Sequence, residues 1–118
     1  MVIKTRTYEE KKKLYQELVD THPEIKLKGK TMPYTSVNGH MFSILDKEGH
    51  LGLRLPEKER KQFMEAHSAS LHEAYGAVMR EYVRVPDELL ADTEALKGYL
   101  AISYDYTRRL KPKPTKRK

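Results

Sequence analysis

The sequence predicts a single α+β domain in which helices pack on one face of an antiparallel sheet of four to five strands. Three observations predict this class: helical periodicity near both ends of the chain, alternation of apolar and polar residues between positions 25 and 55, and an Asn-Gly pair within that alternation. The chain has 118 residues, which is the size of one domain. The expected order of elements is α-β-β-β-β-α-β-α.

The first helix is expected over residues 8–20. Thr7 and Glu10 match a capping box, in which each side chain accepts a hydrogen bond from the backbone amide of the other residue. Apolar residues then recur with a period of about 3.6, namely Tyr8, Leu14, Tyr15, Leu18 and Val19. Pro23 is expected to stop the helix.

Residues 25–55 are expected to form an antiparallel meander. Ile25 and Leu27 alternate with lysines, which is typical of a half-buried or edge strand. Asn38-Gly39 between strands at 32–37 and 40–46 predicts a type I′ turn, because both residues tolerate a positive φ. A second turn is expected at 47–50. The alternation after it places three leucines on the apolar face and Arg54 in water; the leucines are Leu51, Leu53 and Leu55.

The remaining elements are predicted from prolines, helix-capping residues and residue composition. Pro56 is expected at the first position of a helix over 57–67, and residues 68–76 are expected to be irregular or a short turn of helix. Residues 78–85 are rich in β-branched side chains and predict a strand. Residues 86–91 predict a helical turn, and Asp92 is a suitable cap for a final helix over 93–110.

The net charge of +6 is concentrated at the carboxyl end of the chain. Seven of the 23 basic residues fall in 108–118 with no acidic residue among them, which leaves 16 basic against 17 acidic residues in 1–107. We therefore expect one domain over 1–110 and a disordered tail of lysine and proline over 111–118. Such a tail can bind nucleic acid weakly and without sequence preference. The candidate contacts are Lys111, Lys113, Lys116, Arg117 and Lys118.

No pattern predicts a catalytic residue, a cofactor or a metal. The chain lacks cysteine, which excludes disulfides, thiolate catalysis and cysteine-ligated metals. The segment Gly29-Lys30-Thr31 resembles the end of a phosphate-binding loop, but Glu24 stands where that motif requires glycine. The five histidines show no ligand spacing; His67 and His72, for example, are five residues apart and would not align on one helix face.

Tyrosine is unusually frequent, with eight tyrosines against two phenylalanines. Three of them, Tyr99, Tyr104 and Tyr106, lie on the final helix and cannot share one narrow stripe. They are candidate contacts for a protein partner or for a homodimer, because a tyrosine ring is apolar while its hydroxyl tolerates water. The alternative is that they lie at the edge of the core. No apolar run suits a signal peptide or a membrane span, so we expect a cytoplasmic location and no membrane association.

Three segments resemble a known family. The segment 31–45, with its Asn-Gly turn followed by Met41-Phe42, and Leu51-Gly52-Leu53-Arg54-Leu55 resemble the core of TfoX amino-terminal-domain-like (TfoX/Sxy) proteins. The segment 81–90, with Asp92 and Leu96, resembles the closing strand and final helix of that family. The resemblance covers residues 8–110, and the related YjbR/MmcQ-like proteins share much of the same layout. It implies a compact sheet with helices against it, a bacterial cytoplasmic setting and a link to competence regulation, and it carries over no catalytic residue.

These observations predict a non-enzymatic interaction or regulatory domain. The first alternative is a nucleic-acid-associated protein that binds non-specifically through its basic tail. The second is an enzyme or small-molecule binder whose pocket becomes visible only in the fold.

Overall fold

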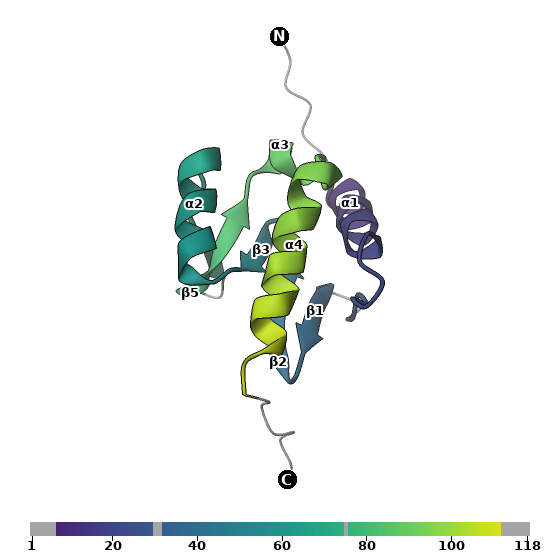
Figure 1. Cartoon of the computed structure of the whole chain (residues 1–118). Coiled ribbons are helices and arrows are strands. Elements are labelled where there is room, and N and C mark those ends of the chain that lie inside the picture. The colour runs from purple at the N-terminus through teal and green to yellow at the C-terminus, as the bar shows by residue number, and fades with distance from the viewer. Residues whose placement is uncertain (1–6, 30–31, 75, 112–118) are drawn as a thin grey trace.

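A five-stranded antiparallel sheet lies at the centre of the fold, and helix α4 crosses in front of it with α1 and α2 on either side (Figure 1). The computed structural model describes residues 7–29, 32–74 and 76–111. The predicted α+β class with an antiparallel sheet is confirmed. The elements are α1 Tyr8–Asp20, β1 Tyr34–Val37, β2 His40–Leu45, β3 Leu51–Arg54, α2 Glu57–His67, β4 Leu71–Ala74, β5 Ala77–Val85, α3 Asp87–Leu90 and α4 Thr93–Arg108.

The predicted capping box begins α1. The Thr7 hydroxyl accepts from the Glu10 amide at 3.2 Å, and the Glu10 carboxylate accepts from the Thr7 amide at 2.8 Å. The two bonds satisfy backbone donors that the first helical turn leaves without partners. Tyr15, Leu18 and Val19 are then buried on the side of α1 that faces the core.

The sheet has the strand order β1-β2-β3-β5-β4. Asn38 and Gly39 have φ values of 56° and 80°, as predicted for a type I′ turn, and they join β1 to β2. The register between these strands shifts, because Thr35 pairs with Ser43 while Ser36 pairs with Met41. The extra residue is Phe42, and the resulting bulge allows both Phe42 and Ser43 to be buried.

The predicted burial of the three leucines of residues 51–55 is confirmed. Leu51, Leu53 and Leu55 are each at most 1% exposed and belong to the core between the sheet and the helices. The prediction that Arg54 lies in water was wrong, because its side chain is only 18% exposed. It pairs with Glu81 of β5 at 2.7 Å, and its guanidinium carbon lies 6.0 Å from the ring centre of Tyr106.

Two segments differ from their predicted form. Residues 25–27 are not a strand; only Lys28 forms a bridge, exchanging hydrogen bonds of 2.8 and 2.9 Å with Tyr34, and Gly29 turns the chain with a φ of 83°. Residues 71–74, which were expected to be irregular or helical, form the outer strand β4 against β5. The strand escaped detection because its buried side chain at position 72 is a histidine, which interrupts any apolar alternation.

Helix starts agree closely with the sequence signals. Pro56 has an extended backbone and precedes α2 as its cap, so the helix begins one residue later than the proline. The predicted helical turn is α3, and the Asp92 side chain accepts from the Ala95 amide at 3.1 Å to cap α4. The far end of α4 is held by the β1–β2 turn, since the Asn38 side-chain amide donates to the Arg108 carbonyl at 2.6 Å.

The sheet has a second face, away from the core. Because side chains alternate along a strand, the burial of Leu51 and Leu53 in the core turns Gly52 to that second face. Gly52 pairs with Arg84 of β5, so Arg84 lies on the same face. The polar residues described next gather there.

Candidate functional site

His72 is the deepest polar side chain on the second face of the sheet. It projects from β4 and is 0% exposed. Its ring covers Gly52 so closely that a Cβ atom at position 52 would lie 2.7 Å from the imidazole Cδ2 and 2.9 Å from Cγ. A glycine in β3 is therefore what provides the space for this imidazole.

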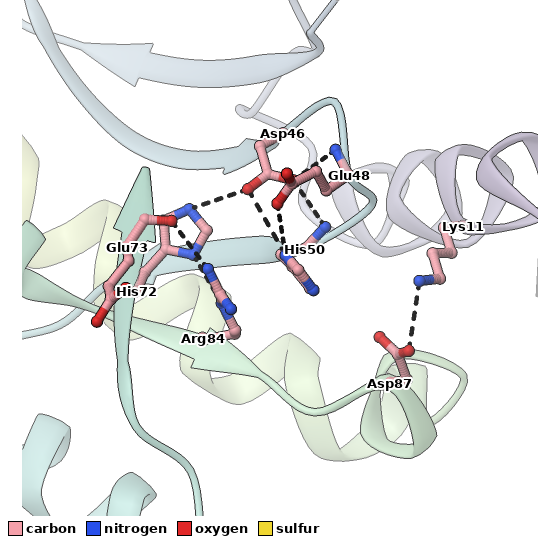
Figure 2. Close-up of polar contacts among 8 residues, drawn as sticks. All are labelled: Lys11, Asp46, Glu48, His50, His72, Glu73, Arg84 and Asp87. Atoms are coloured by element: carbon pink, nitrogen blue, oxygen red, sulfur yellow. Dashed lines mark hydrogen bonds and ion pairs between the residues drawn. The ribbon is translucent and has the colours of Figure 1, made fainter. Parts of the chain in front are cut away.

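The two ring nitrogens of His72 face different partners, as Figure 2 shows. Nδ1 accepts a long hydrogen bond of 3.4 Å from Nε of Arg84, whose Nη2 also donates to the Glu73 carbonyl at 2.8 Å. Nε2 lies 3.7 Å from Oδ2 of Asp46 and has no hydrogen-bond partner. Because Nδ1 accepts a hydrogen bond from Arg84, we assign the neutral tautomer that carries its hydrogen on Nε2, directed at Asp46.

The environment of His72 favours the neutral imidazole. Burial is the main cause that lowers its pKa, and the positive charge of Arg84 lowers it further. The carboxylate of Asp46 acts in the opposite direction, since a negative charge stabilises the imidazolium. The imidazole is thus held neutral between a cation and an anion.

Asp46 organises the turn between β2 and β3. Its Oδ1 accepts from the backbone amides of Glu48 at 3.0 Å and His50 at 2.9 Å, and the Asp46 amide donates to the His50 carbonyl at 3.0 Å. Gly49 completes the turn with a φ of 85°. These bonds commit one carboxylate oxygen to the backbone, so the other oxygen, Oδ2, is oriented toward the imidazoles.

His50 brings a second imidazole to the same carboxylate. Its Nδ1 lies 3.9 Å from Oδ2 of Asp46 and 3.8 Å from Oε1 of Glu48, and it has no hydrogen-bond partner although the atom itself is buried. The His50 side chain as a whole is 33% exposed. Two unpartnered ring nitrogens therefore face one carboxylate oxygen at the margin of a surface hollow.

The hollow beside this cluster has a volume of about 480 Å³. Its walls come from the segment before β1, the β2–β3 turn, β4, the β4–β5 connection and β5. They carry charges of both signs. The lining residues are Met32, Asp46, Lys47, Glu48, Glu73, Gly76 and Arg84.

The three predicted interface tyrosines lie half-buried on different sides of α4. Tyr99 packs edge-on against Phe63, with ring centres 4.8 Å apart, and Tyr104 packs against Phe42 at 5.8 Å. Tyr106 lies under Arg54. Each ring thus contacts its own chain, and their role in a partner interface stays a prediction.

The predicted tail contacts fall largely outside the described residues. Only Lys111 is described; it is exposed, and its carbonyl lies 2.8 Å from Nε2 of His40. Lys113, Lys116, Arg117 and Lys118 are not among the described residues. The nucleic-acid hypothesis therefore stays a prediction.

Sequence reasoning missed the cluster around His72 for an identifiable reason. Its residues come from the β2–β3 turn, β4 and β5, and their spacing along the chain does not indicate that they lie close together in the fold. One local signal was available. Asp46 and His50 are four residues apart on either side of Gly49, which is the spacing of a turn closed by an aspartate side chain.

Comparison with known proteins returned no match: no family model fits the chain, and no curated protein and no solved structure is significantly similar to it. The resemblance to TfoX-like proteins accordingly stays a prediction. Within residues 7–29, 32–74 and 76–111, no helix has the length and apolar character needed to cross a membrane.

Proposed function

We propose that this chain is a non-enzymatic regulatory module that binds a small polar ligand in the hollow beside Asp46, Glu48 and Arg84. The observation that carries the proposal is the imidazole of His72. It is fully buried beneath the hollow, accepts a hydrogen bond from Arg84 and faces Asp46. Burying a polar group lowers the stability of the fold unless the group has an interaction partner. This makes the cluster the best candidate for a binding site.

The geometry favours binding over catalysis. A general acid or base must come within hydrogen-bond reach of its substrate, and His72 has no exposed surface with which to do so. The core hydroxyls serve packing, since Ser43 lies 2.5 Å from both the Tyr15 hydroxyl and the Thr35 hydroxyl and all three residues are buried. A nucleophile held in such a network is shielded from any ligand in the hollow.

The same geometry supports a regulatory role. A ligand at Asp46 or Glu48 contacts the turn that Asp46 itself closes through its Oδ1. That turn joins Leu45 to Leu51, which are both buried core residues. Binding at the hollow can therefore shift the balance between arrangements of the turn, which is what a regulatory ligand requires.

The test is a two-dimensional amide NMR titration of the full chain against a panel of probes: inorganic phosphate, a dicarboxylate, an amino-acid mixture, a nucleotide and divalent metal ions. At least one probe should shift the resonances of residues 46–50, 72–73 and 84 together, in a saturable way. Arg84→Lys should weaken this response, because lysine retains the charge but cannot reproduce the geometry of Nε and Nη2. If no probe shifts these resonances, or if all shifts lie elsewhere, the proposal is wrong.

The proposal includes a protein partner or a second copy of the chain, in the bacterial cytoplasm that the family resemblance implies. Its support is the sheet, in which β1 and β4 are the outer strands. Outer strands offer backbone groups that can pair with another chain, and two-fold dimers are the commonest oligomers. Analytical ultracentrifugation should detect a species of twice the 13.8 kDa chain mass. A monomer at all accessible concentrations would remove the homodimer from the proposal.

A further inference from the structure

We propose that Asp46, Glu48 and His50 form a binding site for a divalent transition-metal ion of the zinc class. This inference names the ligand of the hollow and so rests on the proposed function for its location. It departs from the sequence-based expectation of no metal. One ligand atom from each of these residues lies within 4.8 Å of the other two. We assign the ligand atoms as Oδ2 of Asp46, a carboxylate oxygen of Glu48 and Nδ1 of His50, because these atoms face one another.

The separations between these atoms suit a shared ion. Two ligand atoms that each lie about 2.1 Å from one ion are at most about 4.2 Å apart, and about 3.4 Å apart at a tetrahedral angle. His50 Nδ1 is 3.9 Å from Asp46 Oδ2 and 3.8 Å from Glu48 Oε1. These distances exceed those of hydrogen bonds but fall within reach of a common metal. The exposed Glu48 side chain can supply the remaining adjustment.

Two of the three ligands are already oriented. The backbone bonds to Oδ1 of Asp46 leave Oδ2 directed at the imidazoles, and His50 Nδ1 is buried without a hydrogen-bond partner. An unpartnered nitrogen at that position loses its hydration on folding and receives nothing in return. A metal ion supplies the missing interaction.

His72 gives an independent indication of a ligand at this place. It is fully buried, and its Nε2 points at Asp46 Oδ2 without a hydrogen-bond partner. We assign it as a positioning residue and not as a metal ligand, because Arg84 donates to Nδ1 and thereby keeps the hydrogen on Nε2. Residues of this second layer orient a ligating carboxylate and commonly change metal affinity by about 10–100-fold when replaced.

The surrounding charges permit a cation. Two carboxylates enter the site. Of the cations around it, Lys11 pairs with Asp87 at 3.3 Å and Arg84 bonds to the Glu73 carbonyl and to His72. Lys47 also lines the hollow, on an exposed position of the turn. Figure 2 shows the Lys11 ammonium paired with the Asp87 carboxylate. The imidazole nitrogen favours zinc, nickel or cobalt over magnesium or calcium, which prefer oxygen ligands alone. Three protein ligands leave positions for water.

The experiment is a calorimetric titration of the full chain, expressed without a polyhistidine tag, with Zn²⁺ as the probe. We expect one ion per chain. His50→Ala and Glu48→Gln should each weaken binding by at least about tenfold, since each removes or neutralises a ligand. The matched control is His22→Gln, which removes a half-buried histidine outside the cluster and should leave the affinity unchanged. Glu48 is exposed, so Glu48→Gln remains informative even if His50→Ala perturbs the turn.

A second readout identifies the ligand atom directly. Long-range ¹⁵N NMR should show the Nδ1 resonance of His50 shifting on addition of Zn²⁺, while His72 retains the signature of its Nε2–H tautomer. Absence of zinc binding, or zinc binding equal in wild type, His50→Ala and Glu48→Gln, overturns the inference. If another probe of the panel still shifts residues 46–50, the proposed function stands without the metal; if none does, both are wrong.

Discussion

The imidazole of His72 lies directly on the backbone of Gly52, two strands away across the sheet. A methyl group at position 52 would approach the ring to 2.7 Å, a distance that no side chain tolerates. The cluster with Asp46 and Arg84 therefore depends on the absence of a side chain in β3. This dependence can be tested without touching any polar residue of the site.

Gly52→Ala should lower the free energy of unfolding by about 1–3 kcal/mol, because the added methyl group must displace a fully buried ring. Urea denaturation measures the loss. Gly98→Ala is the matched control: Gly98 lies in α4, and nothing would lie within 4 Å of its added Cβ. That variant should gain about 0.5–1 kcal/mol from helix propensity. Equal effects at the two glycines would contradict the contact with His72.

Leu53→Ala should destabilise the protein by about 2–5 kcal/mol, because it leaves a cavity under the central strand β3. Val78 provides the control, since it is 49% exposed. Val78→Ala should change the stability by less than about 0.5 kcal/mol. Chemical denaturation of both variants gives the comparison, and a small loss at Leu53 would mean that β3 does not face the core.

Tyr82 makes the protein sensitive to alkali. Burial raises the pKa of Tyr82 to about 12, with the charge of Glu81 also raising it and that of Arg54 lowering it. The pKa in the unfolded chain is about 10. The unfolded state therefore loses this proton first, so the contribution of Tyr82 to stability is constant below about pH 10 and is lost as the pH rises toward 12. The raised pKa of Tyr15, caused mainly by its burial, acts in the same direction.

Denaturation between pH 8 and 12, with tyrosine ionisation followed by absorbance, measures this loss. Tyr82→Phe should cost about 0.5–1.5 kcal/mol at neutral pH, because the hydroxyl donates to the Met41 carbonyl at 2.6 Å. The same variant should lose less stability above pH 10 than the wild type does. An identical alkaline profile in both proteins would refute the assignment to Tyr82.

The Asn38 side chain joins the β1–β2 turn to the end of α4, because its amide donates to the Arg108 carbonyl. The Asn38 backbone has a positive φ of 56°. Asn38→Ala loses the hydrogen bond and also places a Cβ with little tolerance for that φ, so we expect a loss of about 1–3 kcal/mol. Asn38→Gly tolerates the φ and loses only the bond, so its cost should be the smaller of the two. The reverse order in thermal or urea denaturation would be inconsistent with this geometry.

The basic tail is tested by a chain that ends at Lys111, which retains the contact between His40 and the Lys111 carbonyl. This truncation removes Lys113, Lys116, Arg117 and Lys118. Any nucleic-acid affinity of the full chain should be weak, independent of sequence and steeply dependent on salt, because it arises from counterion release. It should disappear on truncation. Sequence-selective binding that survives truncation would show that the folded residues contact the bases.

Local signals by themselves determined most of the framework of this protein. The capping box at Thr7, the Asn38-Gly39 turn, the leucine alternation in 51–55 and the Asp92 cap each act within a few residues, and the structure confirms each of them. Each of these features depends only on residues within the same short segment. An amide needs an acceptor three residues away, and a tight turn needs residues that accept a positive φ.

Only the tertiary structure decided the strand at 71–74, the half-buried state of Arg54 and the cluster at the hollow. His72 is buried because Gly52, twenty residues earlier, leaves space for its ring, and its neighbours Asp46 and Arg84 arrive on separate strands and turns. A polar residue in a buried position breaks the alternation on which strand prediction depends. The buried His72 side chain is stabilised by partners that are distant in sequence. One sequence alone does not reveal which distant residues the sheet register places together.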